Sequence, residues 1–321
     1  MRIPTIARLA ATLAGAFLLS AQPSAHAEQT VKLLVGYAPG GPVDAAARLF
    51  APVFAKELGA QAIVENRPGG NATIAGSAVV NAAPDGSTLF FAASPTMTIS
   101  PNVMKKMPFD PGKDLRAVAP ILSYGNVLVI NKDLPFRSID DLVKFAKANP
   151  GKVAYGSAGI GGSNHLSGEL FALQTGTQLN HIPYKGNAPA MTDVMGGQLT
   201  MMFDIIGSAR NYISTDRVRA LAVTSAQRNA SLPDLPTMRE AGLPDFEVIG
   251  WFGLFGPAAM PDDMVAKYND AARKALAQPE LRDKLVQMGY DLWVGEPKVL
   301  ADKVAKEREM WAGVTKNIKF D

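Results

Sequence analysis

The sequence predicts an α/β protein built from two lobes, and three observations support this fold class. Short apolar runs alternate with amphipathic runs from Val31 to Ala92, in the order β-α-β-α-β. A glycine-rich turn between a strand and a helix occurs twice. The two occurrences are separated by a long, mostly apolar, strand-like stretch, Leu115 to Ile130, which is broken around Ser123 to Gly125. Strands separated by helices imply right-handed crossovers and mixed, mostly parallel sheets flanked by helices. Ligands of such sheets gather beyond the carboxyl ends of the strands.

The first glycine-rich turn, Tyr37 to Gly41, joins a strand to an amphipathic helix. Gly40 and Gly41 leave bare amides at the start of this helix, where the positive end of the helix dipole attracts a phosphate or a carboxylate without Lys or Arg. Asp44 either contacts the ligand or occupies the positive end itself and pairs with Arg48, four residues on. The sequence favours the second role for Asp44.

The second glycine-rich turn, Ser157 to Gly162, follows the predicted strand Val153 to Gly156. Ser163 is a suitable N-cap for the next helix, which ends near Gly176. We expect one such turn in each lobe, facing each other across a cleft that closes.

The first 27 residues have the form of a secretion signal. Arg2 and Arg8 precede an apolar core, Leu9 to Leu19, and Ala25-His26-Ala27 fits a cleavage site. We expect cleavage after Ala27 and export of a soluble mature chain. The sequence contains no cysteine, which excludes disulfides, thiolate metal sites and a lipid anchor on cysteine.

The charge of the mature chain is nearly balanced. Without Arg2 and Arg8, the 32 basic residues fall to 30, against 29 acidic residues. No basic run is interleaved with aromatic residues, so a nucleic-acid partner is not expected.

Motifs of catalysis are missing from the sequence. No serine has the Gly-x-Ser-x-Gly surroundings of an α/β-hydrolase, and neither a phosphate-binding loop nor a His-Glu-x-x-His motif occurs. The pair Gly159 and Gly161 lacks a third glycine at Asn164, where a dinucleotide fingerprint needs one. We therefore expect no catalytic residues, no cofactor and no metal.

Three polar side chains outside the turns are candidates for the site. His165 lies two residues beyond the expected N-cap, which turns it toward the second turn, whereas His181 is expected to be structural. Tyr184 offers a phenol that suits a carboxylate. Asp204 ends a strand, where it either accepts a hydrogen bond from a ligand amine or caps the next helix. Its role separates amino-acid ligands from plain carboxylates.

Short motifs along the mature chain resemble one known family. They are Val64-Glu65-Asn66-Arg67-Pro68-Gly69, Ala83-Pro84-Asp85-Gly86, Ser157-Ala158-Gly159 followed by His165-Leu166, Pro183-Tyr184-Lys185-Gly186, Phe203-Asp204, Arg219 to Ser225, and Trp251 to Phe255. In this order they are similar to the Bug receptors of tripartite tricarboxylate transport systems.

The resemblance implies a type II periplasmic binding protein, a Venus flytrap whose two α/β lobes close over a small organic carboxylate. Lobe 1 would comprise residues 28–123 and 250–321, and lobe 2 residues 124–249, with crossings near 120–128 and 246–256. A monomer in the periplasm, without a cofactor, is implied.

In that family the two turns hold the ligand carboxylate through backbone amides and bridging waters. The expected ligand-binding residues are Tyr37, Pro39, Gly40, Gly41, Asp44, Ser94, Thr96, Ser157, Ala158, Gly159, Ser163, His165, Tyr184 and Asp204. The family often has His at the position of Met97, so a partly apolar ligand is favoured if Met97 lines the pocket.

We therefore expect an extracytoplasmic receptor, and not an enzyme, that delivers its ligand to the permease subunits of a tripartite tricarboxylate-type transporter. One alternative is a protein whose closed form signals to a membrane sensor kinase. A more distant alternative is an enzyme acting on a small carboxylate. Dicarboxylates, tricarboxylates, aromatic acids, amino acids and amides all stay open as ligands.

Overall fold

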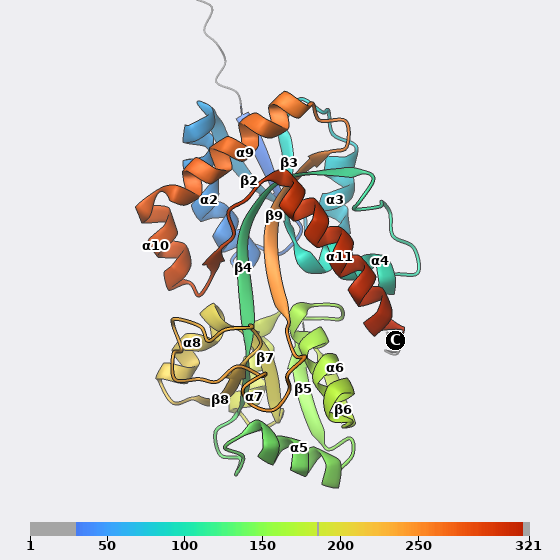
Figure 1. Ribbon diagram of the computed structural model, residues 1–321, viewed down its shortest axis with the longest axis vertical. Coiled ribbons are helices and arrows are strands. Elements are labelled where there is room, and N and C mark those ends of the chain that lie inside the picture. Colours follow the sequence, from blue (N-terminus) through green and yellow to red (C-terminus); the bar gives the residue numbers. More distant parts are fainter. Residues whose placement is uncertain (1–29, 185, 317–321) are drawn as a thin grey trace, which may run out of the picture.

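The computed structural model describes residues 30–184 and 186–316 of the chain, so the expected signal peptide, residues 1–27, lies outside the described residues. Two α/β lobes are stacked along the long axis, and strands β4 and β9 run side by side through the waist between them (Figure 1). The expected α/β class and the arrangement in two lobes are confirmed. Within these ranges, no helix is both long and apolar enough to cross a membrane.

Lobe 1, the upper lobe in Figure 1, is made from both ends of the described chain. Its elements are β1 (Thr30–Val35), α2 (Pro42–Leu58), β2 (Gln61–Asn66), α3 (Thr73–Val80), β3 (Thr88–Ala93), η1 (Pro95–Ile99), α4 (Ser100–Val103), the first part of β4 (Leu115–Asn131), most of β9 (Ile249–Pro257), α9 (Asp262–Ala277), α10 (Pro279–Gln287), β10 (Asp291–Leu292) and α11 (Pro297–Thr315). The sheet order is β2-β1-β3-β9-β4, parallel for β1 with β2 and β3 and antiparallel around β9.

Lobe 2, the lower lobe, uses the middle of the chain. Its elements are the last part of β4, α5 (Ile139–Ala148), β5 (Val153–Ser157), α6 (Ser163–Thr175), β6 (Leu179–Pro183), α7 (Asn187–Met195), β7 (Met201–Ile205), α8 (Ile206–Ser214) and β8 (Val218–Val223). The strands run in the order β4-β7-β5-β6, and β8 also pairs with β4. Strand β5 is parallel to both β6 and β7.

Strand β4 changes partners at the waist. Gly125 pairs with Ile249 of β9 in lobe 1, and the next residue, Asn126, pairs with Ile205 of β7 in lobe 2. The sequence suggested a break around Ser123 to Gly125, and this is wrong, because the strand is continuous from Leu115 to Asn131. Ser123 to Gly125 mark the place where β4 changes its partner strand, and not the end of a strand.

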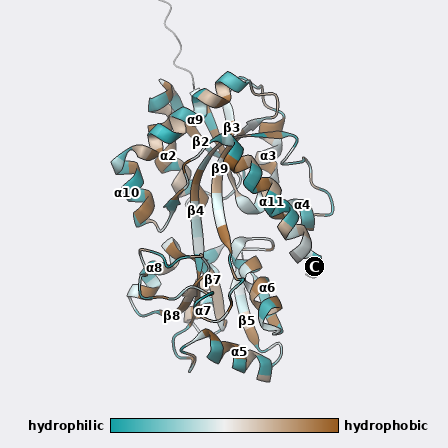
Figure 2. Ribbon diagram, in the orientation of Figure 1, coloured by the Kyte–Doolittle hydropathy of each residue, from teal (hydrophilic) through white to brown (hydrophobic). Residues whose placement is uncertain are grey.

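Each lobe has apolar cores on both faces of its sheet. In lobe 1, Phe50 and Phe54 of α2 stack 5.0 Å apart and pack with Phe91 of β3. Helices α5, α9 and α11 alternate between hydrophobic and hydrophilic residues along their length (Figure 2), as helices packed on one side do. Trp311, near the end of α11, belongs to the same buried cluster as Ile99 of lobe 1 and Phe171 of lobe 2, so this cluster extends across both lobes.

The start of α6 differs from the expectation. Gly162 is the N-cap, in extended conformation with φ −72° and ψ 161°, and Ser163 is the first helical residue. The Ser163 side chain therefore does not cap the helix, and α6 has neither a side-chain cap nor an acidic residue in its first turn.

The pairing of Tyr124 with Gly250 gives a test of the waist. A Cβ atom on Gly250 would lie 2.1 Å from Cζ of the Tyr124 ring, because the ring lies across the glycine on the neighbouring strand. We expect Gly250→Ala to lower the free energy of unfolding by about 1 to 3 kcal/mol, measured by urea denaturation, since the ring must move.

Gly313→Ala is the matched control. Gly313 lies in α11, and an added Cβ meets nothing within 4 Å, so this change should be neutral or stabilise by up to about 1 kcal/mol. An equal, small effect of both substitutions would contradict the packing described for the waist.

Candidate ligand-binding site

Residues from both lobes meet around the hydroxyl of Tyr124 at the waist. Ser94 of lobe 1, Ser163 of lobe 2 and Tyr37 all lie close enough to this hydroxyl to affect its ionisation. Burial raises the pKa of Tyr124, so the phenol stays protonated. The structure thus brings together three of the predicted residues, Tyr37, Ser94 and Ser163.

The lobe 1 side of this junction is a chain of hydroxyl groups. The Tyr37 hydroxyl lies 3.3 Å from Oγ1 of Thr96, and Thr96 donates to the carbonyl oxygen of Asn71 at 3.0 Å. Oγ of Ser94 accepts from the backbone amide of Trp251 at 3.3 Å. Ser94 and Thr96 are both buried. These side chains are therefore held in place by loops that follow the strands β1, β2 and β3.

The first turn already holds a carboxylate of the protein itself. The amide of Gly40 donates to Oδ2 of Asp44 at 2.8 Å, and Arg48 and Asn66 bind the same carboxylate. Burial alone would raise the pKa of Asp44, but these hydrogen bonds and the charge of Arg48 hold it below its usual value of 3.8. Asp44 is 3% exposed and charged, so it neutralises the positive end of α2. Its position agrees with the structural role that the sequence favoured.

The loop itself stays open at its tip. Ala38, Pro39 and Gly40 are exposed, and Gly41 is half-buried. Gly40 has φ 81°, which glycine adopts without strain. The predicted residues Pro39, Gly40 and Gly41 thus form a rim beside the waist.

The second turn is organised from behind by two stacked imidazoles. The rings of His165 and His181 are 4.0 Å apart, and Nδ1 of His165 accepts from the amide of Gly161 at 3.0 Å. Nε2 of His181 lies 2.7 Å from Oγ of Ser157. Burial and the neighbouring His181 lower the pKa of His165 to about 3, so the stack is neutral at pH 7. His165 shapes the turn from the interior and is 3% exposed.

The rest of the second turn leads to the start of α6. Gly159 donates its amide to Oγ of Ser157 at 3.1 Å, and Ala158 and Gly159 are half-buried. As the first helical residue, Ser163 has an N–H without an acceptor inside the helix. Since α6 has no acidic residue in its first turn, its positive end is not neutralised as that of α2 is. This end of α6 is therefore the stronger attractor for an anion at the waist.

Asp204 lies two residues before the first residue of α8, whose N-cap is Ile205, and its side chain makes no cap hydrogen bond to that helix. It accepts from the amide of Ile205 at 2.8 Å and from the side chains of Asn187 and Ser208. Burial raises its pKa to about 6, although these hydrogen bonds act in the opposite direction. Asn187 also accepts from Asn164 of α6 at 3.3 Å. Asp204 thus belongs to a polar network that joins the first turns of α6, α7 and α8.

Tyr184 and Met97 point away from the waist. The Tyr184 hydroxyl donates to Asp193 of α7 at 2.6 Å, and this contact with burial raises its pKa to about 12. Its ring packs in a core cluster of lobe 2 that includes Val194. Met97 is fully buried in a core of lobe 1. The side chain of Met97 therefore carries no information about an apolar ligand.

Three residues at the waist were missed by sequence reasoning. Tyr124 and Tyr290 have edge-to-face rings 6.3 Å apart, and the Tyr290 hydroxyl donates to the carbonyl oxygen of Pro42 at 3.2 Å. Asn71 has φ 54°, unusual for a residue with a side chain, and lies beside Gly161 of lobe 2. The polar interruption at Ser123 to Gly125 was the only signal for Tyr124.

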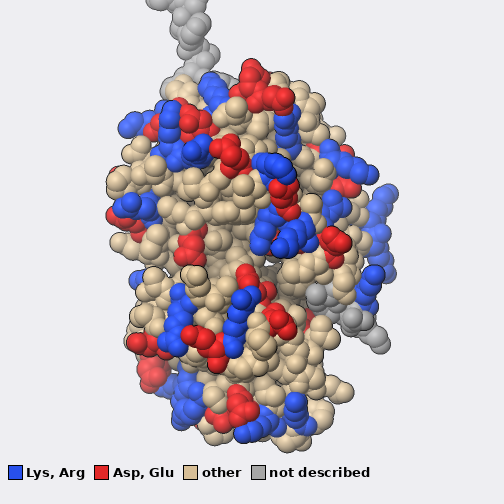
Figure 3. Space-filling model, in the orientation of Figure 1, with Lys and Arg blue, Asp and Glu red and all other residues tan. Residues whose placement is uncertain are grey.

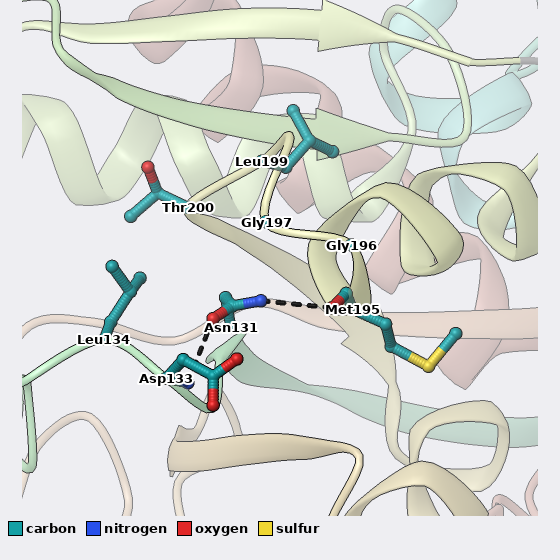
Figure 4. A pocket seen from close by; sticks show the side chains of 8 residues that line it. All are labelled: Asn131, Asp133, Leu134, Met195, Gly196, Gly197, Leu199 and Thr200. Carbon is teal, nitrogen blue, oxygen red and sulfur yellow. Dashed lines mark hydrogen bonds between the residues drawn. The ribbon is translucent and has the colours of Figure 1, made fainter.

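A separate cavity of about 350 Å³ lies at the end of β4 remote from the waist (Figure 4). It is lined by Asn131, Asp133, Leu134, Met195, Gly196, Gly197, Leu199 and Thr200. Asn131 uses its amide to hold the Met195 carbonyl oxygen, 3.2 Å away, and its oxygen to accept from the amide of Asp133 at 3.0 Å. Asp133 is the ionisable residue of this lining, and its carboxylate would repel an organic anion.

The face of the molecule shown in Figure 3 does not have the charge pattern of a surface that binds a polyanion. On the face shown in Figure 3, acidic and basic side chains are interspersed over both lobes and form no broad field of one sign. Binding of nucleic acid depends on such a field.

The network at Asp44 predicts a pH-dependent contribution to stability. We expect Asp44→Asn to lower the free energy of unfolding at pH 7 by about 1 to 3 kcal/mol, because it leaves charge-assisted hydrogen bonds of Arg48 and Gly40 weakened. The folded pKa lies below 3.8, so this stability is present above that pH and is lost as the pH falls through the folded pKa.

The difference between parent and variant should therefore shrink from pH 7 to pH 3 in urea titrations. Asp302→Asn, in an exposed pair with Lys298, should change stability by less than about 0.5 kcal/mol at either pH. A difference for Asp44→Asn that is the same at both pH values would contradict the assignment.

Comparison with known proteins identifies the family of this chain. The family "Tripartite tricarboxylate transporter family receptor" matches residues 46–319. A protein of Pseudomonas sp. strain P51, named "UPF0065 protein in tcbD-tcbE intergenic region", is 38% identical over 89% of this chain and 85% of its own length. Protein BugT of Bordetella pertussis is 31% identical over 89% of this chain and 88% of its own length.

Two solved structures from Rhodopseudomonas palustris are similar in fold. One, with adipate, has a TM-score of 0.83 and 32% identity, covering 89% of this chain and 96% of the other. The other, MatC with bound malate, has a TM-score of 0.80 and 32% identity, and the match covers 89% of this chain and 98% of MatC.

The family consists of periplasmic solute-binding receptors and not of enzymes. Their two-lobe fold, the match over most of the sequence and the amide-lined turn at the waist lead to one assignment. The chain belongs to the receptors of the tripartite tricarboxylate transporter family, the family that includes the Bug proteins.

Proposed function

We propose that this chain captures a small organic carboxylate between its two lobes and delivers it to the permease subunits of a tripartite tricarboxylate-type transporter. The observation that carries the proposal is the start of α6, which presents an unneutralised helix terminus at the junction of the lobes. Amides at a helix N-terminus bind carboxylates without a cationic side chain. The similar proteins solved with adipate and malate support this ligand class.

The surroundings favour a plain carboxylate over an amino acid. A ligand amine would need an acceptor at the waist, and the carboxylates of Asp44 and Asp204 are both engaged by donors of the protein. Breaking either network to bind an amine would leave protein donors unsatisfied. The expected ligand is therefore an organic acid without an amine.

The family description supports delivery to a transporter and export to the periplasm. We further propose that residues 1–27 are removed on export and that the receptor acts as a monomer, with Pro39 to Gly41 and Ser157 to Ser163 on opposite sides of the ligand.

Export gives a direct test. The intact mass of the protein recovered from the periplasm should match a chain that begins at Glu28, because cleavage follows Ala27. A mass that includes Met1 to Ala27 would contradict the signal-peptide assignment.

Ser163 allows the amide at the start of α6 to be removed without changing the fold. Pro suits the first helical position, as Pro42 shows in α2, and Gly162 already has the extended conformation that a residue before Pro requires. Ser163→Pro should weaken binding of the carboxylate that best stabilises the parent protein in a thermal-shift panel including adipate and malate. The expected loss is about tenfold or more by calorimetry.

Ser163→Ala is the matched control, because it removes the hydroxyl and keeps the amide. If both variants bind the ligand equally well, the amide is not part of the site. If no organic acid stabilises the parent protein but an uncharged compound does, the proposed ligand class is wrong.

A further inference from the structure

Asn126 is a fully buried polar residue at the waist, where β4 changes its partner strand. It lies on the same face of β4 as Tyr124, Leu128 and Ile130, because side chains alternate along a strand. Leu128 and Ile130 belong to the buried cluster that contains Leu166 of α6, whereas Tyr124 belongs to a core of lobe 1. Asn126 is therefore the polar residue between two apolar cores, on the face that carries α6.

The amide group of Asn126 has one fixed orientation. Its Nδ2 donates to Oγ of Ser167 in α6 at 3.1 Å, and the Ser167 hydroxyl donates to the carbonyl oxygen of Ser163 at 2.8 Å. Because Ser167 uses its single hydrogen in this way, it must accept from Asn126, and the nitrogen and oxygen of the amide cannot exchange places. The Asn126 side chain is thus held against the first turns of α6.

The oxygen of this amide, Oδ1, has no hydrogen-bond donor. Among the described residues it is the only buried side-chain nitrogen or oxygen atom without a partner. The backbone of Asn126 is satisfied, since its N–H donates to Oγ1 of Thr224 and its carbonyl oxygen accepts from the amide of Thr224, both at 2.8 Å. A buried acceptor without a donor destabilises the protein, and a donor that arrives with a ligand removes this cost.

The chemistry of Oδ1 defines the group that suits it. An ionised carboxylate only accepts hydrogen bonds, so the carboxylate of the ligand cannot bind this oxygen. An ammonium group brings a charge and three hydrogens, and one uncharged amide oxygen does not compensate for its burial. A hydroxyl group brings one hydrogen and no charge, which is what Oδ1 lacks.

We propose that Asn126 is a specificity-determining residue of the cleft: its Oδ1 accepts a hydrogen bond from a hydroxyl group of the ligand, so the receptor selects hydroxycarboxylates over the same acids without the hydroxyl. The start of α6 binds the carboxylate, and Asn126, held on the same helix through Ser167, binds the hydroxyl. This inference rests on the proposed function and narrows its ligand class.

Pairs of acids that differ by one hydroxyl test the inference by calorimetry. Malate and succinate, 2-hydroxyadipate and adipate, and 3-hydroxybutyrate and butyrate are titrated into the mature protein. In at least one pair the hydroxy acid should bind about tenfold more tightly or better, as expected for a hydrogen bond to a buried acceptor. This comparison needs no variant.

Asn126→Leu removes the acceptor and keeps a side chain of similar size, so the two acids of the selected pair should bind with nearly equal affinity. Asn126→Ala is the second variant if Asn126→Leu does not fold. Asn131→Leu is the matched control. Asn131 is a buried asparagine of the same strand, remote from the waist, and the protein engages both ends of its amide, so its variant should keep the parental ratio of affinities.

Equal affinities within every pair in the parent protein would overturn the inference, because water would then supply the hydrogen to Oδ1. A preference for the hydroxy acid that persists without Asn126, or that Asn131→Leu also abolishes, would overturn the role of Asn126. These results leave the proposed function intact, since the acids still bind. If no acid of these pairs or of the thermal-shift panel binds, the proposed function is refuted and this inference falls with it.

Discussion

The structure depends on one constraint, namely that β4 is shared by the sheets of both lobes and β9 runs beside it up to the waist. Because β4 pairs with β9 up to Gly125 and with β7 from Asn126, each sheet is completed by a strand that continues into the other lobe. The lobes therefore have a covalent and hydrogen-bonded axis at the waist, and any relative motion is concentrated there. The strand ends that carry turns, after β1, β3 and β5, lie around this axis. A ligand bound by these turns contacts both lobes, and its binding free energy favours the arrangement in which they meet.

Some helices have a carboxylate of the protein at their N-terminus, and others do not. Asp44 neutralises the start of α2, Ser138 and Asp141 form a capping box at α5, and Asp204 binds the amide of Ile205 and the Ser208 side chain at the start of α8. The start of α6 has no such group, and the neutral stack of His165 and His181 supports its turn from behind. An anion at the waist would therefore meet, at α6, a helix terminus without an acidic residue in its first turn. The surrounding hydroxyl groups and engaged carboxylates favour a plain organic acid.

Much of the fold was predictable because glycine, proline and apolar periodicity determine strands, turns and helices locally. The two glycine-rich turns and the order of elements were recognised in this way, and Asp44 was expected to neutralise α2 from its spacing to Arg48. The direction of a side chain across a strand or helix was not predictable. Thus Met97 and Tyr184 point into cores, His165 lies behind its turn, and Tyr124 was missed because its partners are distant in sequence. The continuity of β4 was also missed, since a change of strand partner has the same local composition as a break.

A calorimetric comparison of acids with their amides tests most directly whether the receptor binds a carboxylate group at the waist. Adipate and adipamide, and malate and malamide, have nearly the same size and shape and differ in charge. These pairs and a wider panel of similar pairs are titrated into the mature protein. At least one acid should bind with a Kd in the micromolar range or lower, and the Kd of its amide should be at least about tenfold higher. An amide that binds as tightly as its acid would contradict the account.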